Sequence, residues 1–268
     1  MGKITIKGVK NASYRWKNSA SVLCNYMPKI EYLEMILKNG AIIPRYYMEH
    51  VEYLGIPELP VIAYPMTCFC DIPFGKVSTH MKTYGHFGIG LKKERCIEDN
   101  GLQPVHYINP DSPFFRDFKE AFHKNFYAAE RLPAEQEYLA DFLLTTLLYI
   151  KPIRGFMDRD GRAKGYVFQD EWEWRFIPAV PGTEELPLIL RQEYTSKKTC
   201  DIFSEVLQNH EEYWLKFKTG DVRYLIVPGE EDAKELIRFI RTLELEDEEK
   251  FLLISKIEIS QQFGEDLI

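Results

Sequence analysis

Apolar side chains recur at intervals of three and four residues in four stretches of the chain, which is the spacing of one buried helix face. The first stretch, 28–39, starts with a proline suited to the first helical turn and is followed by Gly40, a typical C-terminal cap. The last stretch, 230–242, has acidic residues in its first turn and arginines near its end, which suits the helix dipole. The pattern predicts helices over 28–39, from 112 onward, over 133–150 and over 230–242.

Each predicted helix should bury its apolar stripe against the rest of the protein. The residues expected to face inward are Ile30, Leu33, Ile36 and Leu37 in the first helix, Phe115, Phe118 and Phe122 in the second, Leu139, Phe142, Leu143, Leu147 and Ile150 in the third, and Ala233, Leu236, Ile237 and Ile240 in the fourth.

Strand-like segments lie between these helices. They are predicted near 66–72, 86–91, 104–108, 166–178 and 222–228, with a late strand near 255–259. The helices are interspersed irregularly, unlike the regular alternation of a doubly wound fold. We therefore expect an α+β fold with a mixed, largely antiparallel sheet and helices packed around it. Without a Pro/Gly/Ser-rich linker, residues 1–268 are expected to form one α+β domain, with 1–24 allowed as an irregular extension.

Composition and charge narrow the classes of function. Of the 268 residues, 45% are hydrophobic and 28% charged, which is ordinary for a globular protein. The net charge of −7 disfavours broad electrostatic binding to nucleic acid, because such binders carry a basic excess. We find no apolar stretch near the length of a membrane span, no apolar core of a signal peptide, and no framework spacing among the five cysteines. These features predict a protein of the reducing cytoplasm.

The first candidate site is the segment 66–73, read as a strand ended by Pro73. Cys68 and Cys70 would share one face, but Cys-x-Cys without a second pair of ligands is not zinc-site spacing. Buried thiols in a sheet core are favoured instead. Asp71 points to the opposite face, where it is either a functional carboxylate or a turn cap.

The second candidate site is the segment 80–91. In a strand over 86–91, His86, Gly88 and Gly90 share one face, so side chains are missing where a ligand or another part of the protein comes close. The alternative is tight packing on that glycine face. The Gly-x-Gly is not a dinucleotide fingerprint, because the third glycine is missing. His80 and Tyr84 are four residues apart on one helical face and form either a pair at a pocket rim or an ordinary surface pair.

The third candidate site is the segment 169–178, which alternates strictly. Its aromatic face carries Trp172, Trp174 and Phe176, and its charged face carries Glu171, Glu173 and Arg175. One interpretation is a half-exposed antiparallel strand with its aromatic side chains inward and its charges in water. The other is a ladder of charges pointing into a cleft, with glutamate as acid, base or ribose ligand and arginine as an anion clamp. The alternating pattern is the same under both interpretations, so it does not distinguish between them.

The order of these blocks is similar to that of a known family. The segments 30–40, 65–74 (PMTCFCDIPF), 84–94 (YGHFGIGLKKE), 101–109, 170–178 (DEWEWRFIP) and 221–228, together with His80, resemble the AbiGi family of bacterial abortive-infection, phage-resistance proteins over nearly the whole chain. The resemblance implies a part in a two-component defence or toxin–antitoxin arrangement, in which AbiGi-like members are labelled antitoxin.

A more distant likeness is to ADP-ribosyltransferase-like folds, which bind NAD through a histidine and a tyrosine and use a late glutamate on the ribose. The early element here reads Leu-Cys-Asn-Tyr-Met over 23–27, with Asn25 where a histidine is expected and Tyr26 beside it. Asparagine can hydrogen-bond a ribose hydroxyl but carries no proton that titrates near neutral pH. This likeness names NAD as the one cofactor to consider.

Three functions compete, in this order: a defence protein that binds a partner protein, an NAD-dependent ADP-ribosyltransferase-like effector, and a metal-dependent nuclease using Asp71, Glu171 and Glu173. The candidate catalytic residues are Glu173, Arg175, Tyr84 and His80, and the candidate ligand-binding residues are Asn25, Tyr26, His86, Gly88 and Asp71. No metal ligand is assigned, and no membrane or nucleic-acid partner is expected. All of these assignments require the charged face of 169–178 and the glycine face of 86–91 to border one hollow.

Overall fold

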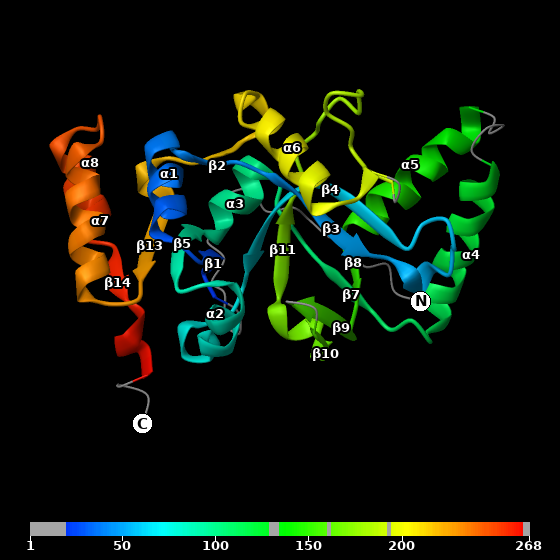
Figure 1. Ribbon diagram of the computed structural model, residues 1–268, viewed down its shortest axis with the longest axis horizontal. Helices are drawn as coiled ribbons and strands as arrows, with labels where there is room; N and C mark the ends of the chain where they lie inside the picture. The colour runs from blue at the N-terminus through cyan, green and yellow to red at the C-terminus, as the bar shows by residue number, and fades with distance from the viewer. Residues whose placement is uncertain (1–19, 129–133, 160–161, 192–193, 265–268) are drawn as a thin grey trace, which may run out of the picture.

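The computed structural model describes residues 20–128, 134–159, 162–191 and 194–264. A sheet of eight strands runs through its centre, in the order β14-β13-β5-β1-β4-β11-β6, and β3 pairs with the first half of β4 (Figure 1). Its neighbouring strands are antiparallel except for β13 and β14. The expected α+β fold with a mixed, largely antiparallel sheet is confirmed.

The bounds of the elements are as follows. The large sheet contains β1 (Val22–Met27), β3 (Arg45–His50), β4 (Val61–Cys70), β5 (Phe87–Lys92), β6 (Gln103–Pro104), β11 (Glu173–Phe176), β13 (Val222–Val227) and β14 (Ile257–Ile259). Three strand pairs lie outside it: β2 (Ala41–Ile42) with β12 (Leu215–Lys216), β7 (His106–Ile108) with β8 (Ile150–Pro152), and β9 (Arg154–Arg159) with β10 (Arg162–Val167). The helices are α1 (Ile30–Asn39), α2 (Ser78–Tyr84), α3 (Lys93–Asn100), α4 (Pro113–Ala128), α5 (Ala134–Leu148), α6 (Lys197–Leu207), α7 (Glu230–Thr242) and α8 (Asp247–Ile254).

Two main apolar cores lie on opposite faces of the sheet. Helices α1 and α7 pack on β1, β5 and β13, whereas α4 and α5 pack beside the first half of β4 at the other end of the molecule (Figure 1). Strand β4 serves both cores, because side chains alternate along a strand. Phe69 enters the first core, and Tyr64 and Met66 enter the second.

The predicted helices are confirmed as α1, α4, α5 and α7, and all four apolar residues predicted for α1 are buried. The predicted inward face of the third helix is partly wrong. Leu139 and Phe142 are 42% and 56% exposed, because α5 packs through Leu143 and Leu147 on one side only. Ile150 lies beyond the helix, in β8, and residue 133 lies outside the described residues.

Three predicted strands, 86–91, 222–228 and 255–259, are confirmed as β5, β13 and β14. The predicted strand 104–108 is divided, because the Val105 amide bonds to the Glu173 carbonyl while the next amide bonds to Tyr149. Strand β4 starts at Val61, five residues earlier than predicted. The central strand β1 was not predicted as a strand of this sheet. Its residues 22–24 fall in the predicted irregular extension, of which 1–19 lie outside the described residues.

The predicted strand 166–178 is three elements. It comprises the end of β10, a 3₁₀ turn at Phe168–Glu171, and β11. Trp172 separates the last two with a left-handed backbone, φ 45°. This conformation is uncommon for any residue other than glycine, and it interrupts the alternation that the sequence suggested.

Gly85 links α2 to the sheet in a conformation that other residues rarely adopt. Its φ is +127°, and a Cβ atom there would overlap the backbone of Met27 and Pro28. We expect Gly85→Ala to lower the free energy of unfolding by about 3 kcal/mol or more, since rigid backbone must move. Equilibrium urea unfolding of the full chain measures this loss.

Gly101 provides the matched control. It also has positive φ, +63°, but a Cβ atom there meets nothing within 4 Å. Gly101→Ala should therefore cost only about 1–2 kcal/mol, the penalty of the left-handed backbone itself. Equal losses in the two variants would contradict the proposed steric role of Gly85.

Candidate functional site

The strand register places the two predicted faces on the same side of the sheet. Cys70 of β4 lies opposite both Cys24 of β1 and Glu173 of β11, and Tyr26 of β1 lies opposite Gly88 of β5. Directly opposite residues of antiparallel strands share a face. The charged side of β11 and the glycine side of β5 therefore look the same way.

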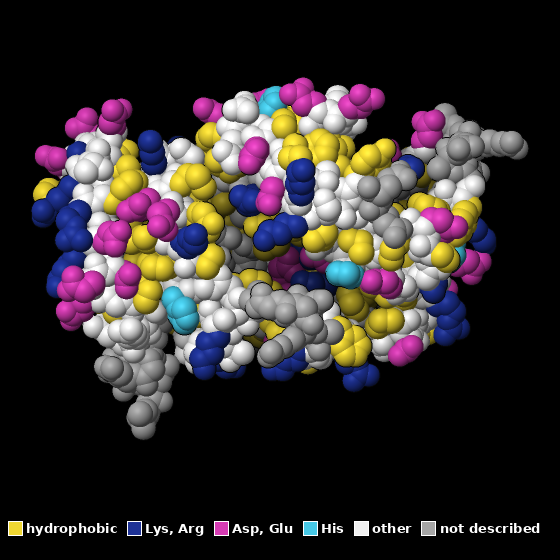
Figure 2. All heavy atoms as spheres, viewed as in Figure 1, with side chains coloured by type: hydrophobic (Ala, Val, Ile, Leu, Met, Phe, Trp, Pro, Cys, Tyr) yellow, Lys and Arg dark blue, Asp and Glu magenta, His cyan; other side chains and the backbone are white. Residues whose placement is uncertain are grey.

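A cavity of about 520 Å³ opens where β1 and β4 diverge. These two strands are in register only at Cys24 and Cys70, and the Asn25 side chain bridges the gap by donating to the Cys68 carbonyl at 2.8 Å. The cavity extends from α1 and β3 at its mouth to the 3₁₀ turn and β11 at its bottom. In the space-filling view, a hollow near the centre of the face shows acidic side chains at depth (Figure 2).

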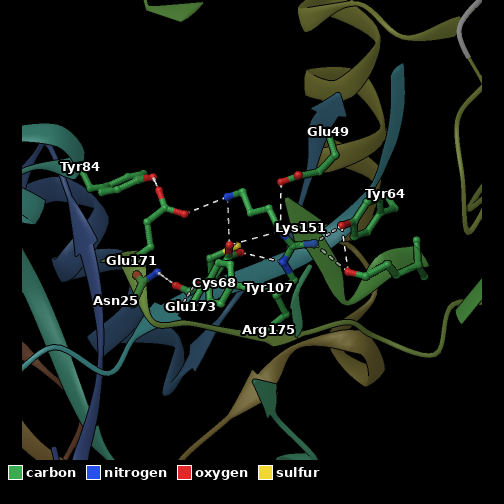
Figure 3. A network of polar contacts seen from close by, with 11 residues as sticks. Asn25, Glu49, Tyr64, Cys68, Tyr84, Tyr107, Lys151, Glu171, Glu173 and Arg175 are labelled. Carbon is green, nitrogen blue, oxygen red and sulfur yellow. Dashed lines mark hydrogen bonds and ion pairs between the residues drawn. The ribbon is translucent and has the colours of Figure 1, made fainter. Parts of the chain in front are cut away.

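A fully buried guanidinium, that of Arg175, lies beneath the cavity floor. Its Nε donates to Glu173 Oε1 at 2.7 Å, and one Nη donates to the Leu148 carbonyl at 2.7 Å and to the Tyr64 hydroxyl. The other Nη reaches Glu49 Oε1 at 3.2 Å (Figure 3). A buried charge is tolerated when it is paired and hydrogen-bonded in this way.

Lys151 joins two carboxylates across the floor. Its ammonium lies 3.1 Å from Glu173 Oε2 and 2.9 Å from Glu171 Oε2, and the Tyr84 hydroxyl donates to the other oxygen of Glu171 (Figure 3). The backbone amide of Glu173 donates to the Tyr107 hydroxyl at 2.8 Å. The floor is thus a continuous network of charge-assisted hydrogen bonds, which are stronger than neutral ones.

The network fixes the charge of its members. Burial alone would raise the pKa of Glu173, but Arg175 and Lys151 outweigh burial and hold it far below the usual value. Burial alone would lower the pKa of Lys151, but the surrounding carboxylates, Glu173 first, hold it well above the usual range. Burial, and then Glu171, raises the pKa of Tyr84, while burial and Glu173 raise that of the Cys68 thiol. These groups keep one protonation state at neutral pH, which suits binding better than proton transfer.

The left-handed backbone of Trp172 positions the two floor glutamates. The 3₁₀ turn that precedes Trp172 carries Glu171. The Trp172 carbonyl accepts from the Asp71 amide at 3.1 Å, which ties the turn to the end of β4. Glu171 and Glu173 are both buried, whereas the Trp172 side chain is 43% exposed. Backbone strain of this kind persists only where the surroundings impose it, and it is frequent at functional sites.

Five of the nine catalytic or ligand-binding candidates line this cavity: Asn25, Tyr26, His80, Tyr84 and Glu173. Glu171, a member of the predicted nuclease set, lines it as well. The predicted pairing of His80 with Tyr84 on one helical face is observed in α2, with ring centroids 4.4 Å apart. The His80 ring also packs edge-to-face with the Tyr26 ring, with centroids 5.7 Å apart. The charged face of β11 is buried, so the half-exposed strand with its charges in water is the wrong alternative.

The other four predicted residues do not line the cavity. Arg175 lies beneath its floor, and His86 is exposed. Gly88 is covered by the Tyr26 ring, only 2.9 Å from where a Cβ atom would be, so the packing interpretation of the glycine face holds there. Asp71 lies on the opposite face of the sheet, paired with the buried ammonium of Lys93.

The residues assigned to a nuclease metal site are therefore not brought together. Asp71 is bound to Lys93, while Glu171 and Glu173 are bound to Lys151. Within the described part of the chain, no three His, Cys, Asp or Glu side chains are placed to share a metal ion.

Lys151, Glu49, Tyr64 and Tyr107 belong to the network but were not predicted. Lys151 lies in a three-residue strand, and Glu49 lies near the end of a strand that mixes polar and apolar side chains without regular alternation, so neither has a local pattern. Only Tyr64 had a usable signal, since it continues backward the alternating face of Cys68 and Cys70 along β4.

Fold and cavity together define an α+β protein with a deep concave face. A family model described as "Putative abortive phage resistance protein AbiGi, antitoxin" matches residues 41–228. The chain is also similar to the abortive phage resistance protein AbiGi of Lactococcus lactis subsp. cremoris, at 32% identity over 253 residues that cover 84% of this chain and 99% of that protein. The chain belongs to the AbiGi family.

No solved structure matches the chain. Among the described helices, none has both the length and the apolar character needed to cross a bilayer.

We expect Glu173→Gln to lower the free energy of unfolding by about 3–5 kcal/mol at pH 7, because it leaves Arg175 and Lys151 buried without their shared carboxylate. The folded-state pKa of Glu173 is lowered from 4.5, so its contribution is present above pH 4.5 and is lost as the pH falls below that value. The difference in stability between wild type and variant should therefore shrink in acid. Urea unfolding between pH 3 and pH 7 measures it.

Glu52→Gln is the control for this prediction, because Glu52 pairs with His50 and both side chains are more than half exposed. It should change stability by less than about 1 kcal/mol. A Glu173→Gln loss no larger than that of the control, or one independent of pH, would count against the network.

Proposed function

We propose that this protein is the antitoxin-type member of a bacterial abortive-infection system and acts in the cytoplasm by binding a partner protein at the mouth of the cavity. Its membership of the AbiGi family supports the defence role. The name of the Lactococcus lactis protein, which this chain matches over nearly all of that protein's length, supports it as well.

The observation that carries the proposal is a set of large apolar side chains exposed around one concave site. Tyr32 and Met35 of α1 and Tyr47 and Met48 of β3 all line the cavity, and they are 41–47% exposed. Tyrosine and methionine are enriched in protein interfaces, and the residues that contribute most to binding cluster around pockets. The buried network below them holds the floor rigid, which lowers the entropic cost of binding.

The test compares partner capture by variants of the mouth. The tagged full-length chain is expressed in its native bacterium, and proteins captured by wild type and by Tyr47→Ser are compared quantitatively. We expect one protein to be captured at least about tenfold less by the variant, as for loss of an aromatic contact in an interface. That protein should be toxic when expressed alone, and co-expression of wild type but not of Tyr47→Ser should relieve the toxicity.

Phe251→Ser is the matched control. Phe251 is 67% exposed on α8 and does not line the cavity, so its loss should leave capture unchanged. Capture that is equally strong with wild type and Tyr47→Ser, or toxicity relieved by both, would show that the partner does not bind at the cavity mouth.

A second candidate function is an ADP-ribosyltransferase-like effector that uses NAD. It is favoured by the convergence of Asn25, Tyr26, His80, Tyr84 and Glu173 on one cavity. In this case the aromatic rings would flank the nicotinamide or ribose, and Glu173 would accept a ribose hydroxyl.

His80→Ala tests this candidate without disturbing the ion network, because His80 lines the cavity and the bonds of that network described above join other residues. NAD should raise the melting temperature of wild type, and His80→Ala should slow NAD consumption by about tenfold through loss of one contact to the nicotinamide or ribose. Chromatography of nucleotides measures consumption. A wild-type protein that neither binds nor consumes NAD would rule the candidate out.

A further inference from the structure

The inner cavity carries more negative than positive charge. Among the described residues, the carboxylates of Glu49, Glu171 and Glu173 are paired with two cations, Lys151 and Arg175, which leaves a formal charge of −1. Arg45 at the mouth does not offset it, because that side chain is half exposed and paired with Asp201 at 2.9 Å. An uncompensated charge in a partly desolvated site favours a ligand of opposite sign.

One carboxylate of the cavity wall is open to a ligand. Glu49 lines the cavity, and its side chain is 20% exposed. Its Oε1 is bound by Arg175, whereas its Oε2 makes no hydrogen bond to a described residue. Polar groups of a partly desolvated site normally find partners, so Glu49 Oε2 marks where a donor of a ligand belongs.

The upper wall suits a flat cation. The rings of Tyr32 and Tyr47 and the thioethers of Met35 and Met48 line the mouth above the carboxylates. A guanidinium stacks on aromatic faces while its N–H groups reach carboxylates, and it is more weakly hydrated than an ammonium. A guanidinium also has five N–H donors, whereas an ammonium has three, which suits a wall with several hydrogen-bond acceptors.

We propose that the cavity binds the guanidinium of an arginine side chain that the partner protein presents, with Glu49 as its carboxylate acceptor. This rests on the proposed function, in which the partner is a protein. The net charge of the whole chain, −7, fits a basic partner surface. A diphosphate ligand is disfavoured, since it would bring more negative charge to the wall.

The test uses small peptides in place of the partner. The full-length protein, labelled with carbon-13 at its methionine methyl groups, is titrated with acetylated, amidated Gly-Arg-Gly and with Gly-citrulline-Gly, its neutral isostere. The arginine peptide should shift the methyl signals of Met35 and Met48 but not that of Met157, which does not line the cavity. It should bind at least about tenfold more tightly than the citrulline peptide, the value of one charge-assisted hydrogen bond.

A pair of variants tests the acceptor. Glu49→Gln removes the excess negative charge and should abolish the preference for arginine over citrulline. Glu52→Gln makes the same charge change at an exposed position outside the cavity and should retain that preference. Equal binding of the two peptides to wild type, or no shift of Met35 and Met48 at 20 mM peptide, would overturn the proposal. So would displacement of the arginine peptide from the cavity by NAD.

The two proposals fail separately. If Tyr47→Ser loses its partner but the arginine peptide does not bind, the proposed function stands and the arginine assignment is wrong. If the peptide binds but partner capture is unaffected by Tyr47→Ser, the arginine site stands and the proposed function is wrong.

Discussion

The fold around the cavity depends on the complete pairing of one buried charge, the guanidinium of Arg175. Its hydrogen bonds tie β11 to the end of α5 and, through Tyr64 and Glu49, to β4 and β3. A guanidinium removed from water destabilises the protein by several kcal/mol unless its donors are matched. The four elements are therefore held where every donor of Arg175 has an acceptor. The positions of these elements in turn determine the shape of the cavity floor.

A floor held in this way limits what the site can do. Glu173 and Lys151 stay charged at neutral pH, because the pKa of the first is lowered and that of the second is raised. The network also holds the carboxylate acceptors of the floor in place. Such a preorganised set of acceptors favours recognition, because little is lost in ordering it on binding. This fits the proposal that the protein holds a partner better than it fits the transformation of a substrate.

The sequence predicted those features that follow from the regular spacing of residues along one segment. The helices α1 and α7 follow from spacing in the sequence, as does the shared strand face of Glu173 and Arg175. The shared face of His80 and Tyr84 follows from the helical period. The turn at Trp172 could not be predicted, since a left-handed residue in a stretch that alternates strictly leaves no mark on the pattern. Lys151 and Glu49 were missed because their roles arise only from contacts between distant segments.

Strands β1 and β4 are joined in register at a single pair, Cys24 and Cys70. On one side of that pair lie β5, β13 and β14, and on the other lie β3, β11 and β6. The wedge beside that junction is lined from both groups, with Asn25 and Tyr26 on one wall and Thr67 and Glu173 on the other. An occupant of the wedge would connect two groups of strands that share few backbone bonds, and binding it would resist their separation during unfolding.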